Sequence, residues 1–269
     1  MLVYRTGAYA PNGIPNADGF VDYYKMINAR DGGIGGEKIV HPECETGYKT
    51  QVGVECYEKN KKDAMVFQPM STGITYQLIP KATADGVTVY STGYGRTSAA
   101  NGKVFKWIFN APATYWDGAT HMVRHILKEN LGNIKGKKIA LIYHNSAYGK
   151  EPIRTLQEAG KKHGFKLSLL PVDHPGQEQK ATWLKIRKSR PDYILMWGWG
   201  VMNSVAIKSA ASIKFPMDKF IGIWWSGSEN DVLPAGQDAH GYKALTFNVP
   251  GTDYQVHMDI QKYVFAKGE

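Results

Sequence analysis

Short apolar runs of strand length alternate with stretches of helical spacing, and this alternation constrains the fold more than any other feature of the chain. In the first part of the chain, the apolar runs that predict strands are residues 2–6, 38–44, 64–68, 87–91 and 105–109. The amphipathic stretches that predict helices are residues 19–29, 48–60 and 72–84. A strand–helix–strand order of this kind predicts a parallel sheet with helices on both faces.

The same pattern restarts after Asn110. Helices are predicted at residues 115–131, 148–163, 179–189 and 202–213, and strands at 138–143, 166–172, 193–197, 219–223 and 244–248. A last helix is predicted at residues 253–266. The predicted fold class is therefore α/β, with two parallel-sheet, Rossmann-like lobes joined by a hinge.

The boundaries of the predicted lobes follow from this restart. We expect residues 1–111 to form the first lobe, residues 112–247 the second, and residues 248–269 an incomplete return to the first. Because the chain opens directly on a strand and stops soon after a helix, we also expect this two-lobed fold to be truncated at both ends. No signal peptide is visible before the first strand.

Composition and charge exclude several classes of protein. Of the 269 residues, 43% are hydrophobic and 21% are charged, which excludes a disordered chain. No run of about 18 apolar residues occurs, which excludes a membrane-spanning helix. The formal net charge is +9, but the lysines and arginines are scattered and accompany no nucleic-acid-binding motif. We therefore interpret them as solvated surface and predict no nucleic-acid partner.

The two cysteines, Cys44 and Cys56, lack the paired spacing of a zinc site. If Cys44 ends a strand and the next helix runs back along it, both thiols lie at similar heights. Three strand residues rise about 3.3 Å each and eight helix residues rise about 1.5 Å each, so the two segments cover similar lengths. The sequence leaves open whether the two come close enough for a disulfide, which would indicate an oxidising compartment.

Five segments rich in Ser, Thr, Gly and aromatic residues follow predicted strands, where open parallel sheets bind ligands. They are residues 68–73, 91–98, 144–149, 197–200 and 223–228. Hydroxyl groups and free backbone N–H groups before helices suit an anion such as a carboxylate. The tryptophans and tyrosines of the second lobe can cover an apolar or aromatic body. The alternative for any single segment is an ordinary helix cap or core packing.

Patterns typical of enzymes are incomplete. His121 and His125 have the spacing of a zinc-binding HExxH helix, but Met122 stands where that motif has Glu. Cys56 and His41 lie at no predicted strand end, which argues against a cysteine nucleophile. The glycine patterns of nucleotide-binding loops and of the GxSxG serine turn are missing. We therefore predict a protein that is not an enzyme and that has no cofactor and no metal site.

Residues 19–36, GFVDYYKMINARDGGIGG, resemble the first helix and the following turn of solute-binding proteins of ABC transporters, in the leucine/isoleucine/valine-binding family. The resemblance continues through Ser71 and Thr72, the 91–97 loop, Tyr148 and the strand at 192–200, and so covers nearly the whole chain. It implies a type I periplasmic binding fold, in which two lobes close on a ligand. It also implies a monomer that delivers its ligand to an ABC permease in the inner membrane.

The resemblance also implies which residues contact the ligand. Ser71 and Thr72 after the third strand, with Gly93, Tyr94 and Gly95 after the fourth, would hold a carboxylate. In the second lobe, the corresponding residues are Tyr148, Trp199 and Trp224. Amino-acid binders of the family have an acidic residue at the position of Trp224. This difference favours a larger apolar or aromatic acid, unless Glu229 folds inward and replaces the missing acid.

The resulting hypothesis is a periplasmic solute-binding protein. It would capture a small carboxylate, either of the branched-chain amino acid type or an aromatic or apolar acid, for uptake by an ABC transporter. Two alternatives stay open: a ligand-sensing receptor domain of the same fold, and an α/β enzyme. A nucleophile or metal cluster at a strand end would favour the enzyme, and an adjoining membrane or DNA-binding segment would favour the receptor.

Overall fold

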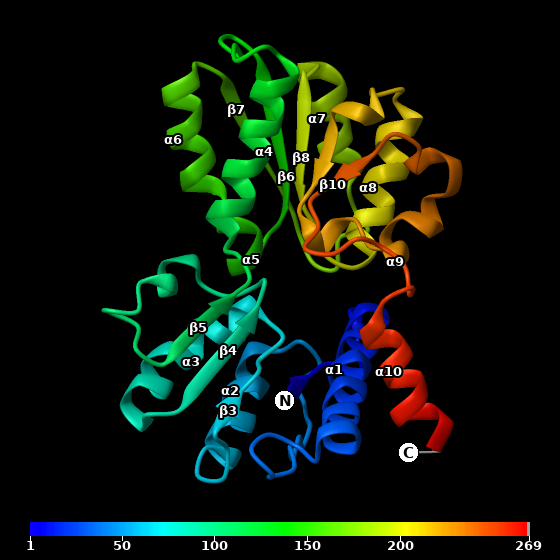
Figure 1. Cartoon of the computed structure of the whole chain (residues 1–269). Coiled ribbons are helices and arrows are strands. Elements are labelled where there is room, and N and C mark those ends of the chain that lie inside the picture. Colours follow the sequence, from blue (N-terminus) through cyan, green and yellow to red (C-terminus); the bar gives the residue numbers. More distant parts are fainter. Residues whose placement is uncertain (268–269) are drawn as a thin grey trace.

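The computed structural model describes residues 1–267, which form two lobes that each contain a parallel sheet (Figure 1). The strands of the first lobe are β1 (Leu2–Val3), β2 (Cys44–Glu45), β3 (Val66–Phe67), β4 (Thr88–Thr92) and β5 (Ile108–Ala111). β1 pairs with β2, and β4 pairs with both β3 and β5, in every case in parallel. The backbone N–H of Leu2 donates to the Gln68 carbonyl at 2.9 Å and so joins β1 to the end of β3.

The helices of the first lobe are α1 (Ala10–Asp31), α2 (Thr50–Asn60) and α3 (Thr72–Asp85), with a 3-10 turn at Thr97–Ala100. Phe67, Val89 and Ile108 lie beside one another on one face of the sheet and pack into a core that includes Ile74 and Leu78 of α3. Alternate residues of a strand point to opposite faces. The buried face of β3–β5 is therefore the one that α2 and α3 cover.

On the other face, α1 covers β1, where Val3 and Ala17 share a core, but β3–β5 are less completely covered than predicted. Val66, Tyr90 and Phe109 are 50%, 37% and 51% exposed. Tyr90 and Phe109 lie opposite each other in the β4–β5 ladder, so their rings form one apolar surface.

The second lobe has a five-stranded parallel sheet in the order β10-β9-β8-β6-β7. Its strands are β6 (Lys138–His144), β7 (Lys166–Val172), β8 (Tyr193–Trp197), β9 (Phe220–Gly222) and β10 (Lys243–Ala244). Its helices are α4 (Tyr115–Glu129), α5 (Ala147–Lys150), α6 (Ile153–His163), α7 (Lys180–Ser189), α8 (Val201–Ser212) and α9 (Glu229–Val232). All five residues of β8 are buried because helices cover both faces of this sheet.

The chain passes between the lobes twice, from β5 to α4 and again after β10. The last helix, α10 (Gln255–Tyr263), returns to the first lobe and lies beside α1 (Figure 1). Arg30 of α1 donates to the Asp259 carboxylate of α10 at 2.7 Å, which fixes the two helices together. A 3-10 turn at Phe265–Lys267 follows.

Several predicted element boundaries are wrong, and side-chain contacts explain two of them. α1 begins at Ala10 rather than near residue 19, with Pro11 in its first turn, where proline needs no N–H donor. The predicted strand at 38–44 shrinks to β2, because Asn28 holds the backbone of Ile39 through two hydrogen bonds of 2.9 and 2.7 Å. Those bonds occupy backbone groups that a sheet ladder would need.

Other boundaries shift at prolines and at strand ends. The predicted helix at 148–163 is divided into α5 and α6 around Pro152. The predicted strand at 105–109 moves to β5, and the predicted strand at 244–248 is confined to β10. The predicted final helix at 253–266 is shorter and ends as α10 at Tyr263.

Cys44 and Cys56 form a disulfide between β2 and α2, with their Cα atoms 6.0 Å apart. The disulfide joins a strand to the following helix, but Cys44 begins β2 rather than ending a strand, and α2 begins at Thr50. Among residues 1–267, no helix is long and apolar enough to cross a membrane.

Candidate functional site

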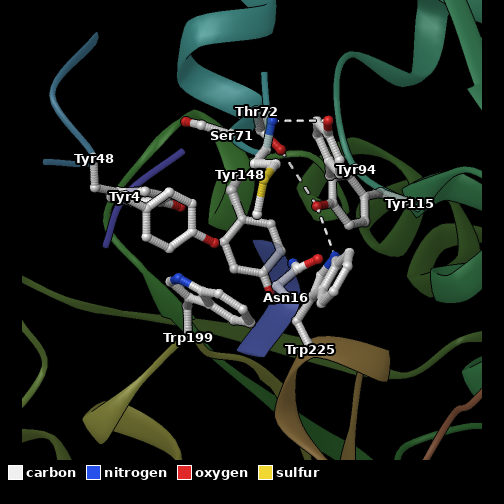
Figure 2. A pocket seen from close by; sticks show the side chains of 11 residues that line it. Tyr4, Asn16, Tyr48, Ser71, Thr72, Tyr94, Tyr115, Tyr148, Trp199 and Trp225 are labelled. Carbon is white, nitrogen blue, oxygen red and sulfur yellow. Dashed lines mark hydrogen bonds between the residues drawn. The ribbon is translucent and has the colours of Figure 1, made fainter. Parts of the chain in front are cut away.

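A pocket lies between the two lobes, at the carboxyl ends of both sheets (Figure 2). It contains about 310 Å³ of empty space, including its mouth. Eleven residues from both lobes line it: Tyr4, Asn16, Tyr48, Met70, Ser71, Thr72, Tyr94, Tyr115, Tyr148, Trp199 and Trp225. The pocket therefore forms only where the lobes meet.

The N-terminus of α3 forms part of the first-lobe wall. Ser71 caps the helix, and its Oγ accepts a hydrogen bond from the backbone N–H of Ile74 at 3.4 Å. The N–H groups of Thr72 and Gly73 belong to the first turn, where the helix offers no acceptor. Together with the helix dipole, these groups favour an anion at this end of α3.

Tyr94 of the first lobe is held by the residue that precedes Ser71. The backbone N–H of Met70 donates to the Tyr94 hydroxyl at 2.8 Å (dashed in Figure 2). Met70 and Tyr48 have backbone φ angles of 50° and 62°. Non-glycine residues seldom adopt such angles, and residues that do are concentrated at functional sites.

The second-lobe wall is aromatic and hydrogen-bonded to the first. The Tyr115 hydroxyl lies 3.3 Å from Thr72 Oγ1 and accepts a hydrogen bond from Trp225 Nε1 at 3.1 Å (Figure 2). Tyr148 packs against Tyr115 with ring centroids 5.2 Å apart, and its hydroxyl donates to the Gly198 carbonyl. These contacts fix the orientation of each ring before a ligand enters.

The pocket wall is electrically neutral. Among the residues that the structure describes, no charged side chain lines it. Burial raises the pKa of all five pocket tyrosines above the ordinary value of 10: Tyr4, Tyr48, Tyr94, Tyr115 and Tyr148. All five hydroxyls are therefore protonated near neutral pH and add no negative charge to the pocket wall.

The structure brings five of the eight candidate site residues into this wall: Ser71, Thr72, Tyr94, Tyr148 and Trp199. Gly93 and Gly95 do not line the pocket but hold residues that do. The carbonyl of Gly93 accepts a hydrogen bond from Trp225 Nε1 at 3.0 Å. The N–H of Gly95 donates to Thr72 Oγ1 at 3.1 Å.

Trp224 does not line this pocket, whereas its neighbour Trp225 does. Trp224 stacks on the outer side of Tyr115, with centroids 5.7 Å apart, and packs against Phe247 at 4.4 Å. Both tryptophans lie in a 3-10 turn at Trp224–Ser226, and strand spacing cannot predict which one faces inward. Glu229 does not replace the missing acid, because it is exposed at the start of α9 and does not line the pocket.

Six further pocket residues are not among the eight candidates: Tyr4, Asn16, Tyr48, Met70, Tyr115 and Trp225. Of these, Met70 and Trp225 lie in the segments 68–73 and 223–228 that follow predicted strands. Tyr4 follows β1 directly, so the rule that ligands bind at the carboxyl ends of strands could have included it. Asn16 was missed because the first helix was predicted to start after it. Tyr115 is the first residue of α4 and follows the passage between the lobes.

A second polar contact joins the lobes outside the pocket. Glu151, which is 8% exposed in the second lobe, accepts hydrogen bonds from the Tyr76 hydroxyl and from the backbone N–H of Thr97. Tyr76 and Thr97 both belong to the first lobe. This arrangement of the lobes is therefore closed, because polar groups of one lobe are satisfied by the other.

The candidate zinc-binding histidines lie on α4, where the polar side chains make structural contacts. Asp117 forms a capping box with Thr114 at the start of α4, and His125 lies 3.2 Å from the Glu129 carboxylate. Within residues 1–267, no group of three or more His, Cys, Asp or Glu side chains is arranged to hold a metal ion.

Comparison with known proteins identifies the family. A family model described as "Periplasmic binding protein" matches residues 1–269. A solved structure described as an ABC transporter permease from the Pseudomonas fluorescens group is 40% identical, with a TM-score of 0.88. The alignment covers 100% of this chain but 66% of that one, so the chain spans slightly less than two thirds of that protein's length. No curated protein sequence matches the chain.

Two further structures share the fold at lower identity. A branched-chain amino acid ABC transporter protein from Thermus thermophilus with bound valine is 19% identical, with a TM-score of 0.83, and the match covers 100% of this chain and 69% of that one. A solute-binding protein from R. palustris in complex with benzoate is 18% identical, with a TM-score of 0.80, covering 99% of this chain and 72% of that one. With two parallel-sheet lobes, a pocket between them and a family match along its whole length, the chain belongs to the periplasmic binding protein family, with the type I fold.

Proposed function

We propose that this protein captures a small carboxylic acid with an aromatic or other apolar body and delivers it to the permease of an ABC transporter. The observation that carries the proposal is the neutral, aromatic pocket between the lobes, which has the N-terminus of α3 in its wall. Binding involves no chemical step. Closure of the lobes around the ligand is the mechanism, because both lobes supply pocket residues.

The carboxylate is assigned to the N-terminus of α3. The Thr72 hydroxyl and the N–H groups of the first turn are donors suited to a negative charge. The Ser71 hydroxyl accepts from the backbone N–H of Ile74 and also interacts with the Tyr48 hydroxyl in the pocket wall. We therefore propose Ser71 and Thr72 as carboxylate-binding residues.

The body of the ligand is assigned to the aromatic side of the pocket. Tyr148, Trp199 and Trp225 present ring faces and edges, with the two tryptophans edge to face at 5.5 Å. Tyr94 is proposed to contact the ligand as well. Three candidates are proposed to act indirectly: Gly93 holds Trp225, Gly95 holds Thr72, and Trp224 holds Tyr115.

The pocket favours an acid without an ammonium group. An amino acid would bury a cation, and no carboxylate among the described residues lines the wall to pair with it. Asp231 is buried in the second lobe, but its carboxylate accepts hydrogen bonds from Asn203 and Ser228 instead. A branched-chain amino acid is the second candidate ligand and is an outcome of the test below.

The periplasm is the proposed location, and a monomer is the proposed state. The Cys44–Cys56 disulfide is typical of proteins in oxidising compartments. Family membership supports a transport role, which involves no catalysis.

A thermal-shift panel tests the proposal with one pair of ligands that differ only in the ammonium group and with one further aromatic acid. The probes are 4-methylpentanoate against leucine, with benzoate as a compact aromatic acid. A ligand at 100 times its Kd adds about 2.7 kcal/mol of stability, which moves the melting temperature measurably. We expect 4-methylpentanoate or benzoate to stabilise the protein and leucine to have no effect. Stabilisation by leucine alone contradicts the proposal.

Thr72→Val removes the proposed carboxylate donor. A hydrogen bond to a charged group contributes about 1.5–3 kcal/mol, so the affinity for the stabilising acid should fall at least about tenfold. Thr83→Val is the matched control, because Thr83 lies near the end of the same helix and donates to the Ile79 carbonyl. Equal effects of the two variants would contradict the assignment of Thr72.

A further inference from the structure

Tyr9 joins the two lobes through a pair of histidines outside the pocket wall. Tyr9 directly precedes α1 in the first lobe, whereas His144 ends β6 and His174 follows β7 in the second. The Tyr9 hydroxyl lies 2.7 Å from His144 Nε2 and 2.7 Å from His174 Nδ1. The centroids of the two imidazole rings are 4.0 Å apart.

The hydrogen-bond pattern limits how many protons this cluster can hold. A hydroxyl has one proton, so Tyr9 donates to one imidazole nitrogen and accepts from the other. One of the two nitrogens that face Tyr9 must therefore be unprotonated. His174 is exposed and can be protonated without breaking this pattern, because its Nδ1–H then donates to Tyr9 while Tyr9 donates to His144. If His144 is then protonated as well, both nitrogens that face Tyr9 carry protons. Neither can accept a hydrogen bond from the Tyr9 hydroxyl.

We propose that Tyr9, His144 and His174 form a latch between the lobes that holds the cleft closed only while His144 is neutral. The latch positions the lobes and does not contact the ligand, because none of its three residues lines the pocket. It therefore acts in the same direction on every ligand that the closed cleft binds.

The surroundings of His144 favour its neutral form. His144 has no exposed surface, and burial, followed by the neighbouring His174, lowers its pKa to about 3. The Asp173 carboxylate opposes this shift weakly and is itself held by the Asn145 amide at 2.6 Å. The other groups that face the cluster are neutral: the Ser146 hydroxyl at 2.7 Å from His144 Nδ1, and the rings of Tyr48 and Tyr148.

The sign of the pH effect follows from the difference between the pKa of His144 in the closed protein and in the open protein. When the lobes separate, His144 loses the cover of Tyr9, and its pKa rises towards the ordinary value of about 6.5. A pKa that is lowered in the closed state means that closure is fully stable above about pH 6.5 and weakens as the pH falls below it. If the pKa reaches that value in the open state, the ratio of closed to open protein decreases about 30-fold between pH 7.5 and pH 5.0, which is the upper bound of the effect.

Small-angle X-ray scattering of the unliganded protein at pH 7.5 and pH 5.0 tests the latch without any ligand. The outcome is therefore independent of the proposed function. We expect the radius of gyration to increase at pH 5.0, with circular dichroism unchanged. An unchanged radius would overturn the proposal. Histidine NMR on the same samples should show one imidazole, absent from the His144→Gln spectrum, that becomes protonated over the pH range in which the radius increases.

Three variants distinguish a latch from general acid sensitivity. His144→Gln keeps a neutral acceptor for the Tyr9 hydroxyl, so its radius should be the same at both pH values. Tyr9→Phe removes the hydroxyl and should already be more open at pH 7.5. His121→Gln alters an exposed histidine of α4 and should behave as the wild type does. Wild-type pH dependence in His144→Gln would overturn the proposal even if the other variants failed to fold.

Discussion

The disulfide between Cys44 and Cys56 should contribute about 3 kcal/mol to the stability of the first lobe. The two cysteines are 12 positions apart. Closing a loop of this length removes about 10 cal/mol/K of entropy from the unfolded chain, or about 3 kcal/mol at 25 °C. Cys56 is 4% exposed within the core of the first lobe, so we choose Cys44→Ala/Cys56→Ala, which introduces no buried hydroxyl.

Urea unfolding with and without dithiothreitol separates the bridge from the side-chain changes. Reduction of the wild type should lower its free energy of unfolding by about 3 kcal/mol, because only the cross-link is lost. The double variant should show at least this loss and no further change on reduction. If reduction shifts the wild type by less than about 0.5 kcal/mol while free thiols appear, the loop-entropy reasoning is wrong.

Three further predictions concern the sheet, the tyrosines and the charge of the pocket. Ile108→Ala should cost about 2–5 kcal/mol because Ile108 is 3% exposed, whereas Phe109→Lys, on the open face, should change the urea-derived stability by no more than about 0.5 kcal/mol. Because burial raises the pKa of Tyr115 and Tyr148, urea midpoints should decrease above about pH 10, as tyrosines of the unfolded chain ionise first. Asn16→Asp places a negative charge in the pocket wall and should weaken binding of the stabilising acid at least about tenfold by calorimetry, whereas Asn133→Asp on the surface should not.

The periodicity of apolar residues predicts most of the fold. The strands of the second lobe, such as β6 and β8, are nearly continuous apolar runs, so their positions are predictable from sequence. β2 is different, because a side-chain amide, that of Asn28, takes the backbone groups that the predicted strand would have used. Periodicity contains no information about such a contact.

The candidate site is predictable where it depends on strand ends and unpredictable where it depends on turns. Ser71 and Thr72 follow β3 and start α3, so topology alone brings them to the cleft. Trp225 replaces Trp224 because a 3-10 turn decides which ring faces the pocket. Asn16 reaches the pocket from a helix whose first turns look like a loop, since they contain Pro11, Gly13 and Pro15.

The central claim is that the pocket selects a carboxylate without an ammonium group. Calorimetric titration of 3-phenylpropanoate and phenylalanine tests it most directly, because these two molecules differ only in that group. Leaving a buried cation unpaired costs about 3–5 kcal/mol, so the acid should bind at least about 100-fold more tightly than the amino acid. Equal affinities, or tighter binding of phenylalanine, would contradict the account.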